Sequence, residues 1–285
     1  MSTREHWTSY WEATDTKAAC LPSPESPAAL VMDARWADLA ASLPEGAKVV
    51  DLACGMGAAG KAMLSAAPHL DMTGVDYAEI ANPDEVGFPV QGGVDLEDLP
   101  LDDAAVDCAV SQYGFEYAGE AATGELVRIL KPGAPCRLLV HHRGSAVVRV
   151  NFVRASILAS LIARRVDGLV EEHNPAGLQT VFDHMIETYG EHPLVLEIAT
   201  VCRDSLRLPD DKRAEVSQRL GAGMRRERAL LDALADAAMD EGDIAALKAA
   251  TSGEMTWEEP RVLHASEEEN APILCWELDG QRKAS

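Results

Sequence analysis

The order of apolar and polar positions divides the chain into parts of different character. Up to residue 43, apolar residues recur at helical spacing, with a break in the proline-rich segment 21–27. Between residues 47 and 142, short apolar runs alternate with helical segments, which is typical of a parallel sheet with helices on both faces. After residue 145 the pattern is helical, and near the C-terminus it returns to strands.

The individual elements follow from these periods. Five central strands are predicted at 48–52, 72–76, 90–94, 107–112 and 136–141, with a helix at 121–130 that ends at Lys131-Pro132-Gly133. Four later helices are predicted at 154–166, 178–189, 211–220 and 225–239, with breaks near 174–175, 192–193 and 221–223. The strands 261–264 and 272–278 close the chain as a hairpin-like pair.

These elements predict four segments within one α/β fold. We expect a helical lead-in or lid at 1–43, a cofactor-binding core at 44–144, a helical insertion at 145–252, and a final strand pair at 253–285 that completes the sheet. The insertion leaves the sheet after the fifth strand, where it could fold over a ligand. In the lead-in, Trp7, Tyr10 and Trp11 share one helix face, which favours a packing stripe over a lid.

The most informative segment is the turn after the first central strand, 49–60, which reads VVDLACGMGAAG. An apolar run ends in an acid, passes two glycines one residue apart, and enters an alanine-rich helix. Glycines let the backbone approach a ligand closely, and a helix start presents free N–H groups, so we expect a nucleotide-like cofactor here. Gly55, Gly57 and Gly60 also spell G-x-G-x-x-G, which keeps a dinucleotide among the candidates.

Two acids bear on which cofactor binds. Asp51, at the end of the first strand, would repel the pyrophosphate of a dinucleotide but suits a cationic ligand such as the ammonium and sulfonium of S-adenosylmethionine. Asp76, at the end of the second strand, lies where an acid binds ribose hydroxyls in either cofactor. Asp76 therefore indicates adenosine binding, and Asp51 favours S-adenosylmethionine.

Composition and charge narrow the class of protein. The 285 residues are 47% hydrophobic and carry a net charge of −22, which argues against nucleic-acid binding. No apolar run reaches the ~20 residues of a membrane span and no signal-peptide pattern occurs, so we expect no span and a cytoplasmic location. The six cysteines form no C-x-x-C pair, which predicts reduced, mostly buried thiols and no metal site. The oligomeric state is left open.

Basic residues are concentrated between residues 126 and 166, a stretch without acids. They are Arg128, Lys131, Arg137, Arg143, Arg149, Arg154, Arg164 and Arg165. We expect them to pair with acids from elsewhere in the fold. The alternative is a pocket wall for an anionic substrate group, for which Arg143, Arg149 and Arg154 are the candidates, because they lie at the entry of the insertion.

Four motifs occur in a recognisable order. They are DLACGMG at 51–57, Asp76, DLEDLP at 95–100 and ELVRILKPG at 125–133. In this order they resemble the class I S-adenosylmethionine-dependent methyltransferases, over roughly 48–142 and the terminal strand pair. The resemblance implies a Rossmann-like fold, with a doubly wound, mostly parallel sheet of seven strands and a helical insertion after strand five. Ala53 departs from the family, which usually has glycine there.

The resemblance also implies a binding role for each residue of the first motif and for the next acid. Asp51, Ala53, Gly55 and Gly57 would surround the methionine part of S-adenosylmethionine. Asp76 would bind the two ribose hydroxyls.

Further residues are implied for the adenine and for the reacting methyl group. Tyr77 would lie against the adenine ring, Asp95 would accept from its amino group, and the Leu96 N–H would face the ring. Ser111 or Gln112 would line the methyl-transfer face.

Methyl transfer itself asks little of the protein, because the sulfonium methyl is already activated and the main task is alignment. A base is needed only where the acceptor must lose a proton. Candidates are His141 and His142 after the fifth strand, and Tyr113, Glu116 and Tyr117 after the fourth. A histidine at a strand end is more commonly structural.

Three function classes follow. The first is methyl transfer from S-adenosylmethionine to an oxygen, nitrogen or carbon nucleophile of a small-molecule acceptor. The second is a non-catalytic or regulatory protein that binds S-adenosylmethionine, and the third is an NAD-dependent oxidoreductase, against which Asp51 and the later motifs count.

Overall fold

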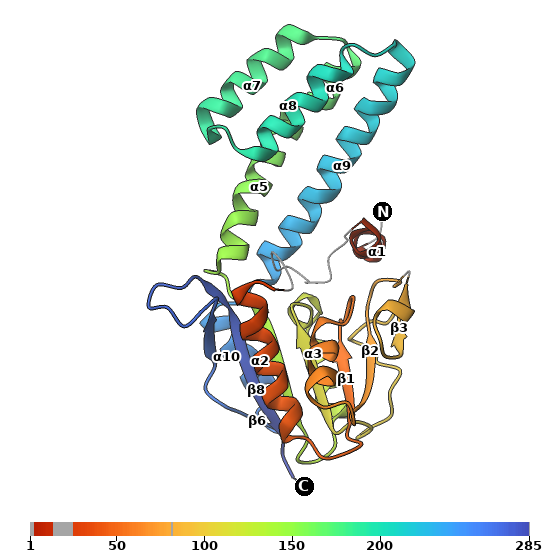
Figure 1. Ribbon diagram of the computed structural model, residues 1–285, viewed down its shortest axis with the longest axis vertical. Helices are drawn as coiled ribbons and strands as arrows, with labels where there is room; N and C mark the ends of the chain where they lie inside the picture. The colour runs from red at the N-terminus through yellow and green to blue at the C-terminus, as the bar shows by residue number, and fades with distance from the viewer. Residues whose placement is uncertain (1–2, 14–24, 81, 285) are drawn as a thin grey trace. The chain divides into compact units, whose positions relative to one another are not determined.

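The computed structural model describes residues 3–13, 25–80 and 82–284. Cys20 and most of the predicted break at 21–27 lie outside these residues. The chain divides into two compact units, a sheet unit of Met1–Val148 with Ala237–Ser285 and a helical unit of Arg149–Asp236. Figure 1 shows the elements of both units.

The sheet unit contains eight strands among the described residues. They are β1 (Lys48–Leu52), β2 (Asp71–Val75), β3 (Val90–Gln91), β4 (Cys108–Gln112), β5 (Pro135–His141), β6 (Met255–Trp257), β7 (Arg261–His264) and β8 (Ile273–Arg282). Their order is β3-β2-β1-β4-β5-β8-β6, and β7 also pairs with β8. The first five strands are mutually parallel, whereas β8 runs antiparallel to β5, β6 and β7. The prediction of a mostly parallel α/β sheet is confirmed, with β6 as the strand that the sequence did not reveal.

Helices cover both faces of this sheet, as a doubly wound fold requires. They are α2 (Pro27–Ser42) and α3 (Ala58–Ala66) on one face, and α4 (Ala121–Ile129) and α10 (Glu241–Ala250) on the other. The unit also contains α1 (Thr3–Ala13) and the short 3-10 helices η1 (Pro83–Glu85) and η2 (Phe115–Tyr117). In Figure 1, α2 and α3 lie in front of the strands. Trp36 of α2 and Met63 of α3 share one buried cluster, whereas Leu126 of α4 and Ile244 of α10 belong to the other.

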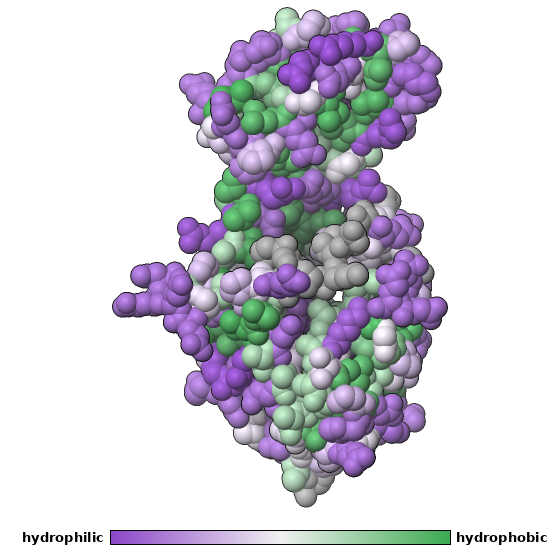
Figure 2. Space-filling view, in the orientation of Figure 1, coloured by the Kyte–Doolittle hydropathy of each residue, from purple (hydrophilic) through white to green (hydrophobic). Residues whose placement is uncertain are grey.

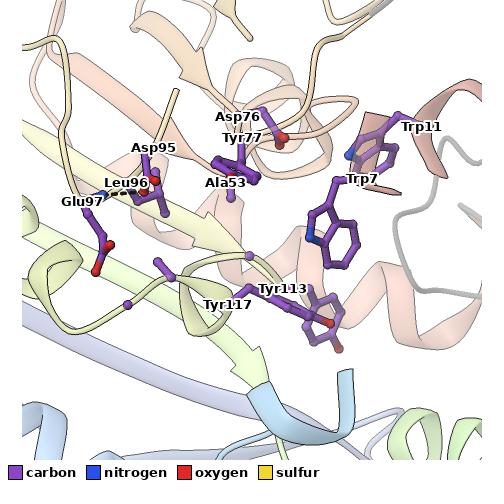
Figure 3. A pocket seen from close by; sticks show the side chains of 13 residues that line it. Trp7, Trp11, Ala53, Asp76, Tyr77, Asp95, Leu96, Glu97, Tyr113 and Tyr117 are labelled. Atoms are coloured by element: carbon purple, nitrogen blue, oxygen red, sulfur yellow. Dashed lines mark hydrogen bonds between the residues drawn. The ribbon is translucent and has the colours of Figure 1, made fainter. Parts of the chain in front are cut away.

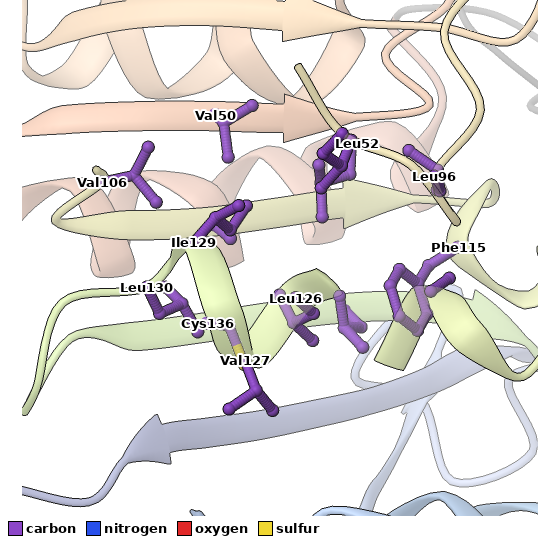
Figure 4. Close-up of a cluster of buried hydrophobic side chains, with 14 of the residues drawn as sticks. Val50, Leu52, Leu96, Val106, Phe115, Leu126, Val127, Ile129, Leu130 and Cys136 are labelled. Carbon is purple, nitrogen blue, oxygen red and sulfur yellow. The ribbon is translucent and has the colours of Figure 1, made fainter. Parts of the chain in front are cut away.

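The strands divide their side chains between these two clusters because successive residues of a strand point to opposite faces. In β1, Val49 packs with α2 and α3, and Val50 packs with α4. Figure 4 shows the second cluster, in which Val50 and Leu52 meet Leu126 and Ile129. All four side chains are fully buried. A sheet buried on both faces explains why its central strands read as nearly continuous apolar runs.

The helical unit is shorter than the predicted insertion of 145–252. Its helices are α5 (Ala146–Ala163), which begins in the sheet unit, α6 (Val166–Glu171), α7 (Pro175–Tyr189), α8 (Pro193–Ser205) and α9 (Asp210–Ala237). The predicted helix at 178–189 corresponds to α7. The chain returns to the sheet at Met239, whose N–H donates to the carbonyl oxygen of His141 at 2.8 Å. Helix α10 therefore belongs to the sheet unit, where Ile244 is buried.

The predicted helix break at 221–223 is wrong, because α9 runs without interruption from Asp210 to Ala237. Gly221 is buried there and faces Asp167, whose carboxylate would overlap with any Cβ at this position. Asp167 pairs with Arg225 at 3.1 Å, and its carbonyl oxygen accepts from the Ser217 hydroxyl at 2.7 Å. The glycine thus permits a close helix contact and does not end the helix.

Helix α5 is the one described helix that is long and apolar enough, by length and composition, to cross a membrane. It has 18 residues and a mean hydropathy of 1.6, against our expectation that no segment would qualify. Ile157, Leu158 and Leu161 in its second half are fully buried in the core of the helical unit. A core helix of a soluble protein meets the same criteria, so this is weak evidence for a membrane span.

Most of the basic residues at 126–166 pair with nearby acids. These pairs are Arg128 with Glu125 and Asp103, Lys131 with Asp107, Arg137 with Asp279, Arg143 with Asp240 and Asp243, Arg154 with Glu227, and Arg165 with Glu172. On the face drawn in Figure 2, hydrophilic residues cover much of the outer surface, in keeping with the strongly acidic composition.

One carboxylate in the sheet unit is buried and forms ion pairs with three arginines. The Glu277 side chain on β8 is fully buried and lies 2.7 Å from Arg35, 3.2 Å from Arg137 and 2.9 Å from Arg261. We expect Glu277→Ala to lower the free energy of unfolding by roughly 3–5 kcal/mol in urea denaturation, because it removes the buried carboxylate that three arginines share, one of which, Arg137, is itself buried.

A matched control for this prediction is Asp38→Ala. Asp38 lies 3.8 Å from Arg35 and from Arg137, but its side chain is 63% exposed, so we expect a loss of about 1 kcal/mol or less. Equal losses in the two variants would contradict the role assigned to Glu277.

Candidate functional site

A cavity of about 280 Å³ lies at the carboxyl ends of the parallel strands, where α/β sheets keep their ligands. The side chains in Figure 3 surround it. Its lining residues are Trp7, Trp11, Ala53, Asp76, Tyr77, Asp95, Leu96, Glu97, Tyr113, Gly114, Tyr117, Ala118 and Gly119. All of them belong to the sheet unit.

The turn between β1 and α3 has the backbone shape that its glycines allow. Gly55 has φ +50° and Gly57 has φ +76°, in the left-handed region that side chains disfavour. Asp51 at the end of β1 is buried, and its carboxylate accepts from the Gly60 N–H in the first turn of α3 at 3.1 Å. Gly60 also lies so close to the Phe88 ring that a Cβ would overlap with it. Gly60 therefore has a packing role that involves no ligand.

Asp76 anchors the same turn from the end of β2. Its two carboxylate oxygens accept from the Gly55 N–H at 2.7 Å and from the Ala78 N–H at 2.8 Å. Burial raises the pKa of Asp76 to about 6 and that of Asp51 to about 7. Asp76 lines the cavity, whereas the Asp51 side chain lies behind the turn.

Ala53 occupies a position where the backbone favours glycine. Its φ is +53°, which explains why glycine is the usual residue of the resembling family there. The Cβ of Ala53 lies against Gly114, which follows β4, and a Cβ added at Gly114 would overlap with it. Because Gly114 has no side chain, there is room for the Cβ of Ala53.

The adenosine-side residues of the sequence prediction come together in this cavity. Tyr77, Asp95 and Leu96 line it next to Asp76, from the loops that follow β2 and β3. The Asp95 carboxylate accepts from the Glu97 N–H at 3.0 Å, which fixes this loop. These residues offer an aromatic ring, an acceptor and an apolar side chain within one site.

Helix α1 forms a wall of the cavity through Trp7 and Trp11. The Trp11 ring lies directly on Gly55, in the space that a Cβ would take. The Arg4 guanidinium lies 4.7 Å from the centre of the Tyr77 ring, and Thr8 Oγ1 accepts from the Glu79 N–H at 3.1 Å. Two of the three aromatic residues whose helical spacing favours a packing stripe, Trp7 and Trp11, therefore line the cavity.

Tyr113 lines the cavity, and the His141 ring and the Glu116 carboxylate are buried next to it. Tyr113 has a left-handed backbone, with φ +57°, and its ring stacks on His141 with centroids 4.2 Å apart. Burial lowers the pKa of His141 to about 3, so its ring is neutral at physiological pH. The backbone N–H of His141 donates to Glu116 Oε1 at 2.8 Å, and burial raises the pKa of Glu116 to about 7.

Ser111, Gln112 and His142 do not line the cavity. The Ser111 hydroxyl donates to the Leu52 carbonyl oxygen at 2.7 Å, and Gln112 Oε1 accepts from the Trp36 indole at 2.7 Å. His142 stacks on Trp276, and its Nδ1 accepts from the Gly144 N–H at 2.8 Å. Each of these side chains holds neighbouring segments together, and Tyr113 takes the place at the end of β4 that was predicted for Ser111 or Gln112.

The three arginines proposed for an anionic substrate group lie elsewhere. Arg143 pairs with Asp240 at 2.7 Å and with Asp243 at 3.0 Å, next to the start of α10. Arg149 and Arg154 belong to the helical unit, where Arg149 is exposed and Arg154 pairs with Glu227. None of the three lines the cavity.

Comparison with known families finds a match within the sheet unit. Residues 50–138 match the family model described as a methyltransferase domain. This part of the chain is a class I methyltransferase domain. The match spans the four motifs from Asp51 to Gly133, and the cofactor of the domain is S-adenosylmethionine. Asp76 and the cavity that it lines fit this cofactor, whereas Asp51, Gly55 and Gly57 shape the turn without lining the cavity.

Solved structures similar to the methyltransferase domain differ widely in coverage. The S-adenosylmethionine dependent methyltransferase of Mesorhizobium loti is 24% identical in sequence, with a TM-score of 0.32. The alignment covers 39% of this chain and 55% of that protein. Geranyl diphosphate C-methyltransferase of Streptomyces coelicolor is 19% identical, with a TM-score of 0.37, and the alignment covers 48% of this chain and 64% of that protein. A Burkholderia thailandensis 1,6-didemethyltoxoflavin-N1-methyltransferase is 12% identical, with a TM-score of 0.45, and the alignment covers 90% of this chain and 79% of that protein.

These similarities leave the acceptor undetermined. The chain spans 55% and 64% of the length of the first two structures, and all three TM-scores are below 0.5. A comparison with curated proteins finds no match in sequence.

The contact between Ala53 and Gly114 gives a test of the site geometry in the methyltransferase domain. We expect Gly114→Ala to weaken S-adenosylhomocysteine binding at least tenfold in calorimetry, because the new Cβ would push the loops after β1 and β4 apart. In the double variant with Ala53→Gly, much of this loss should be recovered, because the overlapping Cβ is gone. The carbonyl oxygen of Ala53, 3.0 Å from the added Cβ, keeps the recovery partial. Additive effects of the two substitutions would show that the loops do not meet as described.

The raised pKa of Glu116 gives a pH-dependent prediction. Because the folded state holds this proton more tightly than the unfolded chain, ionisation of Glu116 lowers stability as pH rises from about 4.5 towards 7. Glu116→Gln removes this titration, so the variant should gain on the order of 1–3 kcal/mol relative to the natural protein between pH 5 and 8. The comparison between the two proteins cancels the opposite effect of His141, whose lowered pKa favours folding as pH rises from about 3 to 6.5. A constant difference in unfolding free energy across this range would contradict the assignment.

Proposed function

We propose that the protein is an S-adenosylmethionine-dependent methyltransferase that acts on an oxygen, nitrogen or carbon nucleophile of a small-molecule acceptor. The observation that carries this proposal is the cavity at the carboxyl ends of β1, β2 and β4. The cavity is lined by residues suited to binding adenosine and by aromatic residues that follow β4, and both groups lie in the methyltransferase domain.

The lining residues indicate how the cofactor would be held. Asp76 would bind the ribose hydroxyls through lone pairs left free by its two backbone bonds, with Tyr77 and Leu96 against the adenine. The methionine part would then lie towards β1 and β4, near Ala53 and Gly114. This orientation follows because β1 lies between β2 and β4 in the sheet.

A dinucleotide fits this turn less well. The carboxylate of Asp51 is bound to the Gly60 N–H in the first turn of α3, where a dinucleotide would place its pyrophosphate. A phosphate there would meet a buried acid in place of a free N–H group. We therefore favour methyl transfer over an NAD-dependent reaction.

Bound S-adenosylmethionine supplies an activated methyl group, and the residues of the chain orient the acceptor and exclude water. Tyr113 and Gly114 lie at the methyl end, and Tyr113 is fixed by its stacking on His141. His141 acts in this proposal as a positioning residue for Tyr113, because a base with a pKa near 3 removes protons poorly at neutral pH.

Single substitutions test this cofactor assignment. We expect S-adenosylhomocysteine to bind in calorimetry and NAD to show no binding. Asp76→Asn should weaken S-adenosylhomocysteine binding at least tenfold, since a hydrogen bond to a charged group contributes about 1.5–3 kcal/mol. Asp98→Asn is the control, because Asp98 is an exposed acid outside the cavity and should leave affinity unchanged. Tight NAD binding, or full affinity in a folded Asp76→Asn variant, would contradict the proposal.

A further inference from the structure

Aromatic side chains gather around the cavity more than elsewhere in the chain. The sequence has five tryptophans and five tyrosines, and five of these ten line this one cavity. They are Trp7, Trp11, Tyr77, Tyr113 and Tyr117. Figure 3 shows that they come from α1, from the loop after β2, and from the segment after β4.

These aromatic residues divide between the two ends of the cavity. Tyr77 belongs to the adenosine end, next to Asp76 and opposite Asp95. Trp7, Tyr113 and Tyr117 lie together at the other end, where the methyl group of the cofactor would point. An acceptor must approach the methyl group from this side, so these rings are the surfaces that it would meet.

The rings at the methyl end are held in place by contacts within the fold. Trp7 meets Tyr117 edge to face, with centroids 5.0 Å apart and an interplanar angle of 82°. Tyr113 stacks on His141, and its hydroxyl donates to the Leu274 carbonyl oxygen at 3.4 Å. Fixed aromatic surfaces favour a flat partner, because stacked or edge-to-face rings gain contact with little loss of side-chain freedom.

The charged side chains that line the cavity are all acidic, and Arg4 lies outside the lining, 4.7 Å from the centre of the Tyr77 ring at the adenosine end. The charged lining residues are Asp76, Asp95 and Glu97, and among the described residues no lysine or arginine lines the cavity. Arg143 and Arg154 are already paired with acids of the chain. A carboxylate or phosphate on the acceptor would therefore be desolvated without a counter-charge from the residues that line the cavity.

We propose that Trp7, Tyr113 and Tyr117 form the acceptor subsite, and that it takes a planar aromatic acceptor that carries no negative charge. This proposal rests on the proposed function, because it assumes that the cofactor occupies the adenosine end. It replaces the anionic substrate group that the arginine-rich stretch of the sequence suggested.

Three probes that share a fused two-ring skeleton separate shape from charge. They are 2-naphthol, the saturated 2-decalol, and 2-naphthoate, in which a carboxylate replaces the hydroxyl of 2-naphthol. Binding of each to the full chain is measured by calorimetry in saturating S-adenosylhomocysteine. We expect 2-naphthol to bind at least tenfold more tightly than either of the other two.

Substitutions then locate the binding surface. Trp7→Leu should weaken 2-naphthol binding at least tenfold, whereas Trp7→Phe, which keeps an aromatic ring, should lose less. Tyr117→Leu tests the facing wall independently of α1. Tyr10→Leu is the matched control, because Tyr10 lies on the same helix, contacts both tryptophans and does not line the cavity. S-adenosylhomocysteine affinity is measured for every variant.

The outcomes separate this inference from the proposed function. Absence of S-adenosylhomocysteine binding to the natural protein would overturn both. Normal cofactor binding with no 2-naphthol binding, or with 2-naphthoate or 2-decalol bound as tightly, would overturn the aromatic subsite alone. Unchanged 2-naphthol affinity in both Trp7→Leu and Tyr117→Leu would also overturn it. Selective 2-naphthol binding that both substitutions weaken, with cofactor affinity retained, would support it.

Discussion

Two buried carboxylates hold the turn on which the whole site depends. Burying a carboxylate is unfavourable unless hydrogen bonds replace its water, and here backbone N–H groups do so. Asp51 binds the Gly60 N–H in α3, and Asp76 binds the Gly55 N–H in the turn and the Ala78 N–H beyond β2. These bonds join two neighbouring strands to the intervening helix. The positions of Ala53 and Tyr77 along the cavity follow from them.

The sheet supplies only part of the cavity, and α1 supplies a wall from outside the sheet. Trp11 packs on Gly55 and Trp7 meets Tyr117, so both tryptophans contact segments that the sheet positions. Arg4 and Thr8 add contacts to the loop after β2. A glycine at position 55 thus serves twice, because it permits the left-handed backbone and leaves room for an aromatic ring. In the function we propose, this helix and the segment after β4 together form the methyl end of the cavity.

Local pattern was enough to predict most of the strands, because the central ones are buried on both faces and read as short apolar runs that end at turn residues. It did not predict β6, and β3 ends at Gln91, three residues before the predicted end. The boundaries of β1 agree with the prediction, and those of β2, β4 and β5 differ by one residue at one or both ends. The course of α9 could not be predicted, since Gly221 is explained by Asp167, which is distant in sequence and close in space. The same holds for Trp7, whose helical spacing fits a packing stripe equally well, and for Gln112, which is engaged by Trp36. Sequence patterns predict which face of an element is buried, but not which partner it meets.

The titratable groups nearest the methyl end are arranged to support its walls. His141 lies behind Tyr113 as a neutral ring, and its backbone N–H is bound by Glu116. Its stacking compensates for the left-handed backbone that Tyr113 must adopt, a conformation that costs on the order of 1–3 kcal/mol. A histidine buried in this way loses its basicity and gains a fixed orientation. In the reaction we propose, the group after β4 and β5 therefore contributes the placement of an aromatic surface, which is the alignment that methyl transfer requires.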